Sequence, residues 1–159
     1  TTVDARDGSV RSEVTIRLHN SVSTTDLPRA VVGNNRGVPV GTNLTWLSLF
    51  TPHEVLTARL DGEPLTLGSG GEAGLRAWDT PLLQVPPGGT TTLEVELVGT
   101  VDLRDGYRFR YVPQPVAEPD EVSVRLAVRS GSVARSADGT ARVSGPAIEP
   151  LLRVADVRR

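Results

Sequence analysis

Several segments of the chain alternate apolar and polar residues with a period of two, which is typical of β-strands that bury one face. They are Val10 to His19, Thr90 to Val98, Val122 to Arg129 and the shorter segments 54–60, 63–67, 75–85 and 107–111. No window longer than ten residues keeps a period of 3.6, so we expect little helix. The pattern indicates a chain built from many short strands.

Glycine-bearing turns separate these segments. Four are Asp-Gly pairs, at 7–8, 61–62, 105–106 and 138–139, and a fifth is Pro86-Pro87-Gly88-Gly89. Asp tolerates a positive φ and Gly has no Cβ to clash there, as a two-residue hairpin turn requires. We therefore predict an all-β fold: an antiparallel two-sheet β-sandwich, immunoglobulin-like, with long loops and little helix. The length of 159 residues predicts a single domain, 1–159.

Two polar or glycine-rich stretches interrupt the strand pattern. The longer one, Asn20 to Thr42, is rich in Ser, Thr, Asn, Gly and Pro, and its apolar island Ala30–Val32 is expected to dock it to the body. The other, Gly68 to Gly74, is expected to be a loop. Because loops carry variable contacts on rigid β scaffolds, these two are the expected contact surfaces.

The aromatic residues divide into expected core and expected surface. Asn43 to Phe50 carries apolar residues on both faces, so we expect a strand covered on two sides with Trp46 buried. Trp78 stands close to Arg76 and Asp79, and is the aromatic most expected to be exposed. The residues expected to contact a ligand are Trp78, Asn34, Asn35 and Arg36.

Composition excludes several classes of function. There is no Cys, which removes disulfides, thiol catalysis and thiolate metal sites. The net charge is −2 with both signs interspersed, so nucleic acid is not an expected partner. No apolar run approaches the roughly 20 residues needed to cross a bilayer. The absence of Met predicts that the chain is a piece of a longer protein.

No catalytic or metal-binding constellation is recognisable. His19 and His53 stand alone and are expected on the surface, and Ser69 lacks the G-x-S-x-G context of a hydrolase. Asp79 and Glu54 are the carboxylates that a glycan-processing enzyme would use, provided that the fold brought them together. The acidic region formed by Asp102, Asp105, Glu118, Asp120 and Glu121 does not match a calcium loop. We predict no catalytic residue, no cofactor and no metal.

Arginines recur in two of the predicted strands. Arg108 and Arg110 beside Arg125 and Arg129 would form an anion-binding stripe if their strands were neighbours. Cross-strand pairing with Glu94 and Glu96 would neutralise them equally well, and we expect this neutral arrangement.

Four sequence segments together resemble those of a known family. They are Gly41-Thr42-Asn43 leading through Trp46 to Pro52, Leu60-Asp61-Gly62-Glu63-Pro64, the turn from Pro86 to Thr90, and Tyr111 to Asp120. They are similar to the C-terminal portion of the actinobacterial domain of unknown function 4012, over roughly Val10 to Val128. The resemblance implies a membrane-anchored parent protein with a large part outside the cytoplasm, and it supplies no catalytic residues.

The expected function is a non-catalytic extracytoplasmic β-sandwich module of a cell-envelope protein, with a structural or interaction role. Its expected partner is a protein or glycan of the envelope, and the segment itself is expected to be soluble. The alternative is a carbohydrate-binding module for envelope glycans, which requires at least two exposed and roughly coplanar aromatic rings and is expected to include Trp78. An enzyme is not expected.

Overall fold

The computed structural model describes residues 1–23, 28–33, 36–104, 107, 109–111, 121–130, 132–133, 140–146, 152–153 and 157–158. The chain forms two compact units, unit 1 with Thr1–Ser12 and Val98–Arg159, and unit 2 with Glu13–Leu97. Two strands, β2 (Ser9–His19) and β10 (Thr90–Thr100), contribute residues to both units. The all-β, sandwich-like fold class is confirmed, and α1 (Arg29–Val32) is the only helix among the described residues. The single domain 1–159 stays a prediction.

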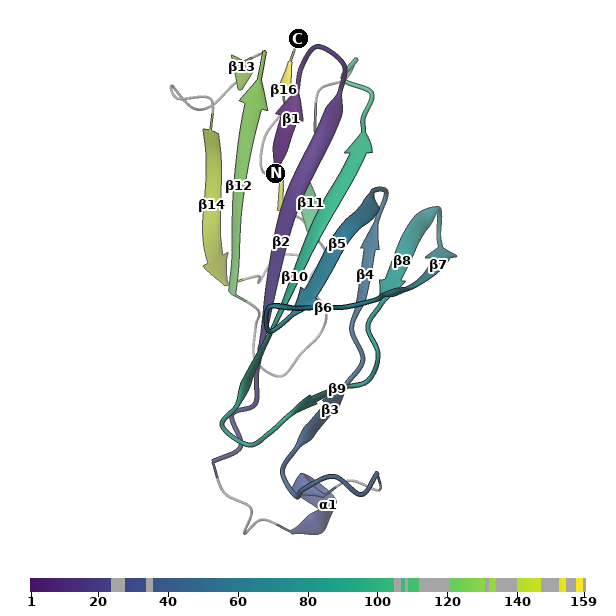
Figure 1. Ribbon diagram of the computed structural model, residues 1–159. Helices are drawn as coiled ribbons and strands as arrows, with labels where there is room; N and C mark the ends of the chain where they lie inside the picture. Colours follow the sequence, from purple (N-terminus) through teal and green to yellow (C-terminus); the bar gives the residue numbers. More distant parts are fainter. Residues whose placement is uncertain are drawn as a thin grey trace. The chain divides into compact units, whose positions relative to one another are not determined.

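Unit 1 is built on one run of hydrogen-bonded strands and two small pairs. Its strands besides β2 and β10 are β1 (Thr2–Asp4), β11 (Arg110–Tyr111), β12 (Glu121–Arg129), β13 (Ser132–Val133), β14 (Thr140–Pro146), β15 (Leu152–Arg153) and β16 (Val157–Arg158). The order β14-β12-β1-β2 is visible in Figure 1, while β11 pairs with β15 and β13 with β16. The β1–β12 pair is parallel, so the sheet is mixed rather than purely antiparallel.

The first Asp-Gly pair forms the predicted hairpin between β1 and β2. Val3 is opposite Val10, and Gly8 has a φ of 74°. The Asp7 carboxylate accepts the Ser9 N–H at 2.8 Å, which is ordinary Asx-turn chemistry. The pairs at 105–106 and 138–139 lie outside the described residues.

The core of unit 1 lies under this hairpin and β12. Val3 is fully buried and Leu126 is 1% exposed, and the strand alternation predicted for Val122–Arg129 is confirmed. The remaining buried members of the cluster are Ala5, Val10, Leu103 and Tyr107. Burial of Tyr107 raises the pKa of its phenol, because the charged form is poorly solvated there.

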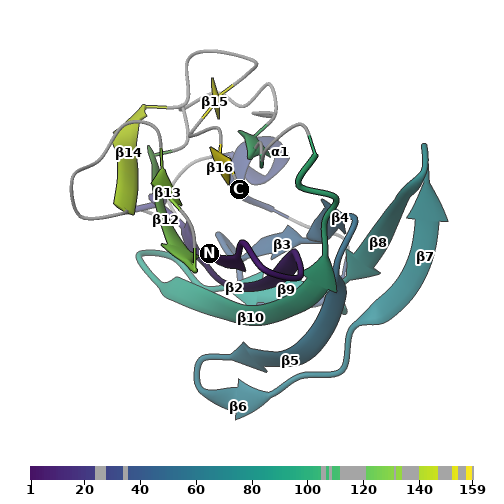
Figure 2. The ribbon, with the colours of Figure 1, turned by 90° about the horizontal axis from the view of Figure 1, so that it is seen from above.

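Unit 2 contains three groups of strands. Its strands besides β2 and β10 are β3 (Asn43–Thr45), β4 (Ser48–Thr51), β5 (Glu54–Leu60), β6 (Glu63–Pro64), β7 (Gly68–Glu72), β8 (Leu75–Asp79) and β9 (Leu83–Val85). They are ordered β2-β10-β5-β6, β4-β8-β7 and β3-β9. Figure 2 shows β4, β8 and β7 side by side as a curved sheet.

Two-residue turns with positive φ close two hairpins of unit 2. Asp61 and Gly62 have φ values of 51° and 87° and join β5 to β6, as predicted. Ala73 and Gly74 have φ values of 50° and 80° and join β7 to β8. The prediction of a loop over Gly68–Gly74 is therefore wrong. The ladder to β8 holds the glycine-rich segment extended despite its low β propensity.

The core of unit 2 is centred on β10. Leu93, Val95 and Leu97 are all at most 4% exposed, which confirms the amphipathic strand predicted at Thr90–Val98. The partly buried residues packed against them include Val14, Ile16, Leu47, Leu49, Val55 and Leu60. Because Leu47 and Leu49 pack against this core, their side chains face the interior of unit 2.

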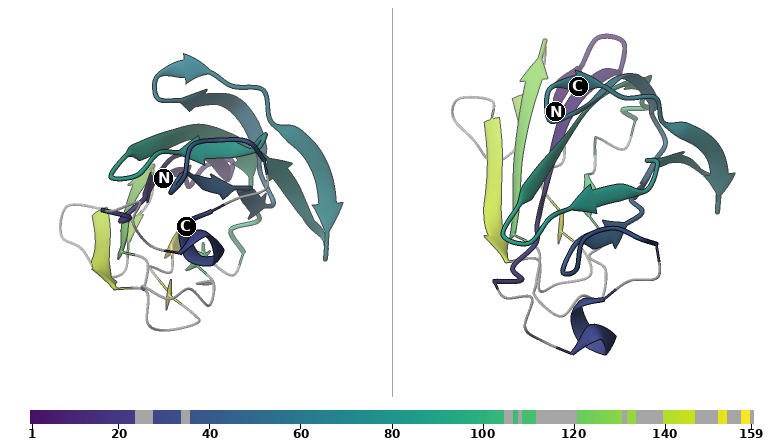
Figure 3. Two further views of the ribbon diagram at one scale, coloured as in Figure 1. Left: turned by 90° about the horizontal axis from the view of Figure 1, so that it is seen from below. Right: turned by 60° about the horizontal axis from the view of Figure 1, so that its bottom comes forward.

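The long segment after β2 is fastened at both of its ends. Asn20 is 4% exposed, and its amide Nδ2 donates to the carbonyls of Gly41 and Val85 at 2.8 and 2.9 Å. Within the apolar island, Val32 in α1 is 6% exposed and its carbonyl accepts the Gly41 N–H, whereas Ala30 is exposed. Docking of the whole island to the body stays a prediction. Figure 3 shows α1 close to the end of the β3–β9 pair.

Candidate binding surface of unit 2

Residues 46–50 alternate strictly between exposed and partly buried positions. Trp46, Ser48 and Phe50 are exposed, whereas Leu47 and Leu49 pack against the β10 core. Ser48 and Phe50 share one face of β4 (Ser48–Thr51), because side chains alternate across a strand, and Trp46 is exposed just before this strand. The segment is thus covered on one side only.

Trp46 is 71% exposed and Phe50 is 41% exposed. The prediction that Trp46 is buried is therefore wrong. Its segment is apolar on both faces, so the alternation alone does not choose which face turns inward. One signal was present in the sequence: Ser48 shares the face of Trp46, while the opposite face carries only leucines.

Two further exposed apolar residues lie on the same side. Phe50 is opposite Ala77 in the β4–β8 ladder, so Leu75, two residues from Ala77, is on the face of Phe50. Thr45 is opposite Leu83, and Trp46 and Leu82 each directly adjoin one member of this pair in the sequence. Leu75 and Leu82 are 36% and 41% exposed. We call the side formed by Trp46, Phe50, Leu75 and Leu82 the outer face.

A polar pair lies on the outer face between the two rings. The Ser48 hydroxyl donates to Oδ1 of Asp79 at 2.5 Å, and these residues are opposite each other in the β4–β8 ladder. Ser48 is exposed and Asp79 is half-buried, and an ionised carboxylate has a second oxygen that accepts hydrogen bonds. The outer face therefore combines aromatic surface with a fixed hydrogen-bonding group.

Neither Trp78 nor Arg36, the described residues that were predicted to contact a ligand, is part of the outer face, and the expectation that Trp78 is the most exposed aromatic residue is wrong. Trp78 is half-buried beside Leu49, and its indole N–H donates to the carbonyl of His53 at 3.2 Å. It belongs to the side of β8 opposite the outer face. Arg36 is exposed in a bend of the long segment, and Asn34 and Asn35 lie outside the described residues.

The two histidines have different environments. His19 is exposed, as predicted, and a nitrogen of its ring lies 3.1 Å from the Thr90 hydroxyl. His53 is only 8% exposed, so the prediction of a surface position is wrong. Burial lowers the pKa of His53 below its ordinary value of 6.5, because the imidazolium loses hydration there.

The carboxylates proposed for an enzyme have separate partners. Glu54 forms an ion pair with Arg76 at 2.5 Å, while Asp79 accepts the Ser48 hydroxyl. Arg76 and Asp79 are three residues apart on β8 and so project to opposite sides. No contact therefore joins Glu54 and Asp79 in a common site.

The acidic region considered for calcium is described only in part. Asp102 pairs with Arg104, whereas residues 105, 118 and 120 lie outside the described ranges. Over the part of the chain that the structure describes, no group of three His, Cys, Asp or Glu side chains is placed to hold a metal ion.

The expected cross-strand pairing of the arginines with Glu94 and Glu96 is wrong for Arg110, Arg125 and Arg129, because β10, which carries both glutamates, lies between β2 and β5. Arg108 lies outside the described residues. The alternative arginine stripe does not form across strands either. Arg110 is in β11, which pairs with β15, whereas the neighbours of β12 are β1 and β14. Arg125 and Arg129 of β12 do share a face, since they are four residues apart on one strand.

No family model matches the chain, and neither a curated protein nor a solved structure matches it. In the described ranges, no helix has the length and apolar character needed to cross a membrane.

Proposed function

We propose that this chain is a non-catalytic interaction module of a cell-envelope protein, located outside the cytoplasm, and that it binds carbohydrate through the outer face. The observation that carries the proposal is the 71% exposed Trp46. Full burial of a large apolar side chain is worth roughly 1.5–3 kcal/mol, and this ring forgoes most of that stabilisation. A large exposed apolar surface is informative because it marks interaction sites.

Carbohydrate is the partner whose chemistry fits this surface. A pyranose ring has an apolar face that stacks on an indole, and hydroxyl groups around its edge. Trp46 and Phe50 supply the aromatic surface, and the Ser48–Asp79 pair supplies an acceptor of fixed orientation. Such a combination of ring and oriented polar group suits a neutral, hydroxyl-rich ligand better than a purely apolar one.

The location outside the cytoplasm is supported by the resemblance to the domain of unknown function 4012. On this proposal the parent protein is anchored in a membrane and this segment presents the outer face to envelope glycans. The absence of Cys agrees with a module whose stability comes from its two β cores.

Tryptophan fluorescence tests the proposal directly. The variant Trp78→Phe leaves Trp46 as the only tryptophan, so its emission reports on the outer face alone. Titration with hexasaccharides of glucose, mannose, xylose and galactose should change this emission saturably for at least one series. In Trp46→Ala the affinity for that series, measured by calorimetry, should fall at least tenfold, about 1.4 kcal/mol.

Asp79→Asn is the second variant, because it removes the carboxylate and keeps both rings. It should weaken binding without abolishing the fluorescence change. Leu56→Ala is the matched control, since Leu56 is 52% exposed and is not part of the outer face. Absence of binding to every series, or equal affinity in wild type and Trp46→Ala, would show that the carbohydrate proposal is wrong.

A further inference from the structure

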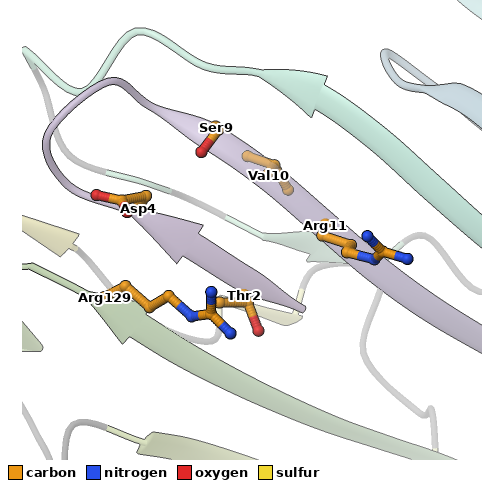
Figure 4. Close-up of a pocket in the computed structure, with 6 residues that line it drawn as sticks. All are labelled: Thr2, Asp4, Ser9, Val10, Arg11 and Arg129. Carbon is orange, nitrogen blue, oxygen red and sulfur yellow. The ribbon is translucent and has the colours of Figure 1, made fainter.

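Unit 1 contains an open recess on one side of β1, between β2 and β12. Its volume is about 230 Å³, and its lining is Thr2, Asp4, Ser9, Val10, Arg11 and Arg129. Figure 4 shows these six side chains. Five of the six lining residues carry polar side chains, and two of these residues are arginines.

The register of the strands explains how two arginines reach the same recess. On one side of β1, Thr2 is opposite Arg11 of β2, and on the other side Asp4 is opposite Arg129 of β12. Paired residues project to the same face of a sheet. In Figure 4 the Arg129 side chain extends along β1 to Thr2, and the Arg11 guanidinium lies on the other side of Thr2.

The carboxylate in the recess does not neutralise Arg129. Oδ1 of Asp4 accepts the backbone N–H of Arg6 at 3.0 Å, which ties this side chain to the β1–β2 turn. Figure 4 shows the Asp4 carboxylate pointing away from both guanidinium groups. Within the described ranges no ion pair forms between Asp4 and Arg129, although they are register partners. Arg11 already has an interaction of its own, so the charge available to a ligand comes mainly from Arg129.

We propose that this recess binds a single phosphate or sulfate group, held by the Arg129 guanidinium over the Thr2 hydroxyl. The planar guanidinium presents parallel N–H donors that match two oxygens of an oxyanion, and the hydroxyl adds a third donor. This site is independent of the carbohydrate proposal, because no residue of the outer face takes part in it.

Nuclear magnetic resonance titration of the whole chain with sodium phosphate and with sodium sulfate tests the site. Sodium chloride at equal ionic strength is the reference, because salt screens surface charge whatever its identity. We expect saturable shifts at the Nε–H signals of Arg11 and Arg129 and at the amides of β1 and the start of β2. A parallel titration with acetate distinguishes a tetrahedral oxyanion from a carboxylate.

Three variants separate site binding from general electrostatics. Arg129→Gln should lower the phosphate affinity at least tenfold. Arg17→Gln is the matched control, since it removes an equal charge from an exposed position of β2 and should leave the affinity unchanged. Arg129→Lys keeps the charge but not the planar fork, and should give an intermediate affinity.

Signal dispersion in each spectrum shows that the variant is folded. If phosphate and chloride give the same shifts, or if Arg129→Gln and Arg17→Gln bind phosphate equally, the site does not exist. Tighter binding of acetate than of phosphate would overturn the assignment to a tetrahedral oxyanion.

Discussion

His53 couples the stability of unit 2 to pH. Its imidazole is buried and its pKa lies below 6.5, so the folded state holds the neutral ring while the unfolded chain takes up a proton. Where the unfolded state binds more protons, the free energy of unfolding falls as the pH falls. We therefore expect this free energy, measured by urea denaturation, to decrease as the pH is lowered from 7.5 through 6.5 and on toward the lower pKa of the folded state.

The variant His53→Gln should show a smaller decrease over the same range, because glutamine does not titrate. His19→Gln, at an exposed position, should keep the wild-type pH dependence. The same slope in His53→Gln as in the wild type would contradict the assignment.

Gly8 and Gly62 both have positive φ but differ in the space around them. A Cβ on Gly8 would lie 2.1 Å from the carbonyl oxygen of Val101, whereas one on Gly62 would meet nothing within 4 Å. Gly62→Ala should cost about 1 kcal/mol of unfolding free energy from backbone strain alone. Gly8→Ala should cost roughly 3 kcal/mol or more, since backbone must also move. Urea denaturation gives both values, and equal losses would contradict the close approach at Gly8.

At the residue scale the sequence predicts turns better than exposure. The Asp61-Gly62 turn is recognisable because both residue types tolerate the positive φ that the turn requires. The exposure of Trp46 and the burial of His53 depend on which strands pack above them. Strand packing is not encoded in the neighbouring residues, so the local sequence pattern did not predict the exposure of Trp46 or the burial of His53.

At the scale of elements, Asn20 holds the segment between β2 and β3 to its neighbours. Its side chain donates to two carbonyls, and its own Oδ1 accepts the Val22 N–H at 3.2 Å. Asn20→Ala leaves buried carbonyls without these donors, at a cost of about 2–3 kcal/mol. Thermal or urea unfolding should show this loss.

Asn20→Asp is the sharper variant, because it keeps the acceptor for Val22 and loses the two donors. It should be at least as unstable as Asn20→Ala. Asn43→Ala, at an exposed position of β3, should change the free energy of unfolding by no more than about 0.5 kcal/mol. Wild-type stability in Asn20→Asp would show that the two donated hydrogen bonds contribute nothing.

The elements predicted best are those with one clearly apolar face. β2, β10 and β12 follow the predicted alternation, because their buried positions are aliphatic and their exposed ones polar. β7 was predicted as a loop because its residues have little strand propensity. Its pairing with β8 comes from the Ala73-Gly74 turn, and Ala is not a residue that favours the positive φ found there.

At the scale of the whole molecule, the tryptophans and the tyrosines belong to different units. Both tryptophans are in unit 2, and both tyrosines are in unit 1. Because β2 and β10 contribute to both units, we expect the units to unfold together as one domain. Tryptophan fluorescence and tyrosine absorbance should then give the same urea midpoint.

Leu93→Ala tests the same point through the core of unit 2. It removes a side chain that is 1% exposed and should cost about 2–5 kcal/mol. The tyrosine transition of unit 1 should move with the tryptophan transition of unit 2. A tyrosine midpoint that stays at its wild-type value would show two independently folding domains.

The fold class was predictable because strand periodicity and turn chemistry agree along the chain. The surface that we propose to bind carbohydrate was not, since its residues come from three segments that the sheet register brings together. Neither Leu75 nor Leu82 has a local sequence feature that connects it with Trp46.

The exposed edge strand β7 has a consequence for self-association of the protein. All five of its residues are exposed, three are glycines, and neither lysine nor proline protects the strand. An extended segment of another chain can therefore lie alongside it with little steric hindrance, continuing the sheet beyond the boundary of a single molecule. In concentrated solution the protein should self-associate through the exposed edge of β7. The variant Ser69→Pro should suppress this association, as measured by analytical ultracentrifugation.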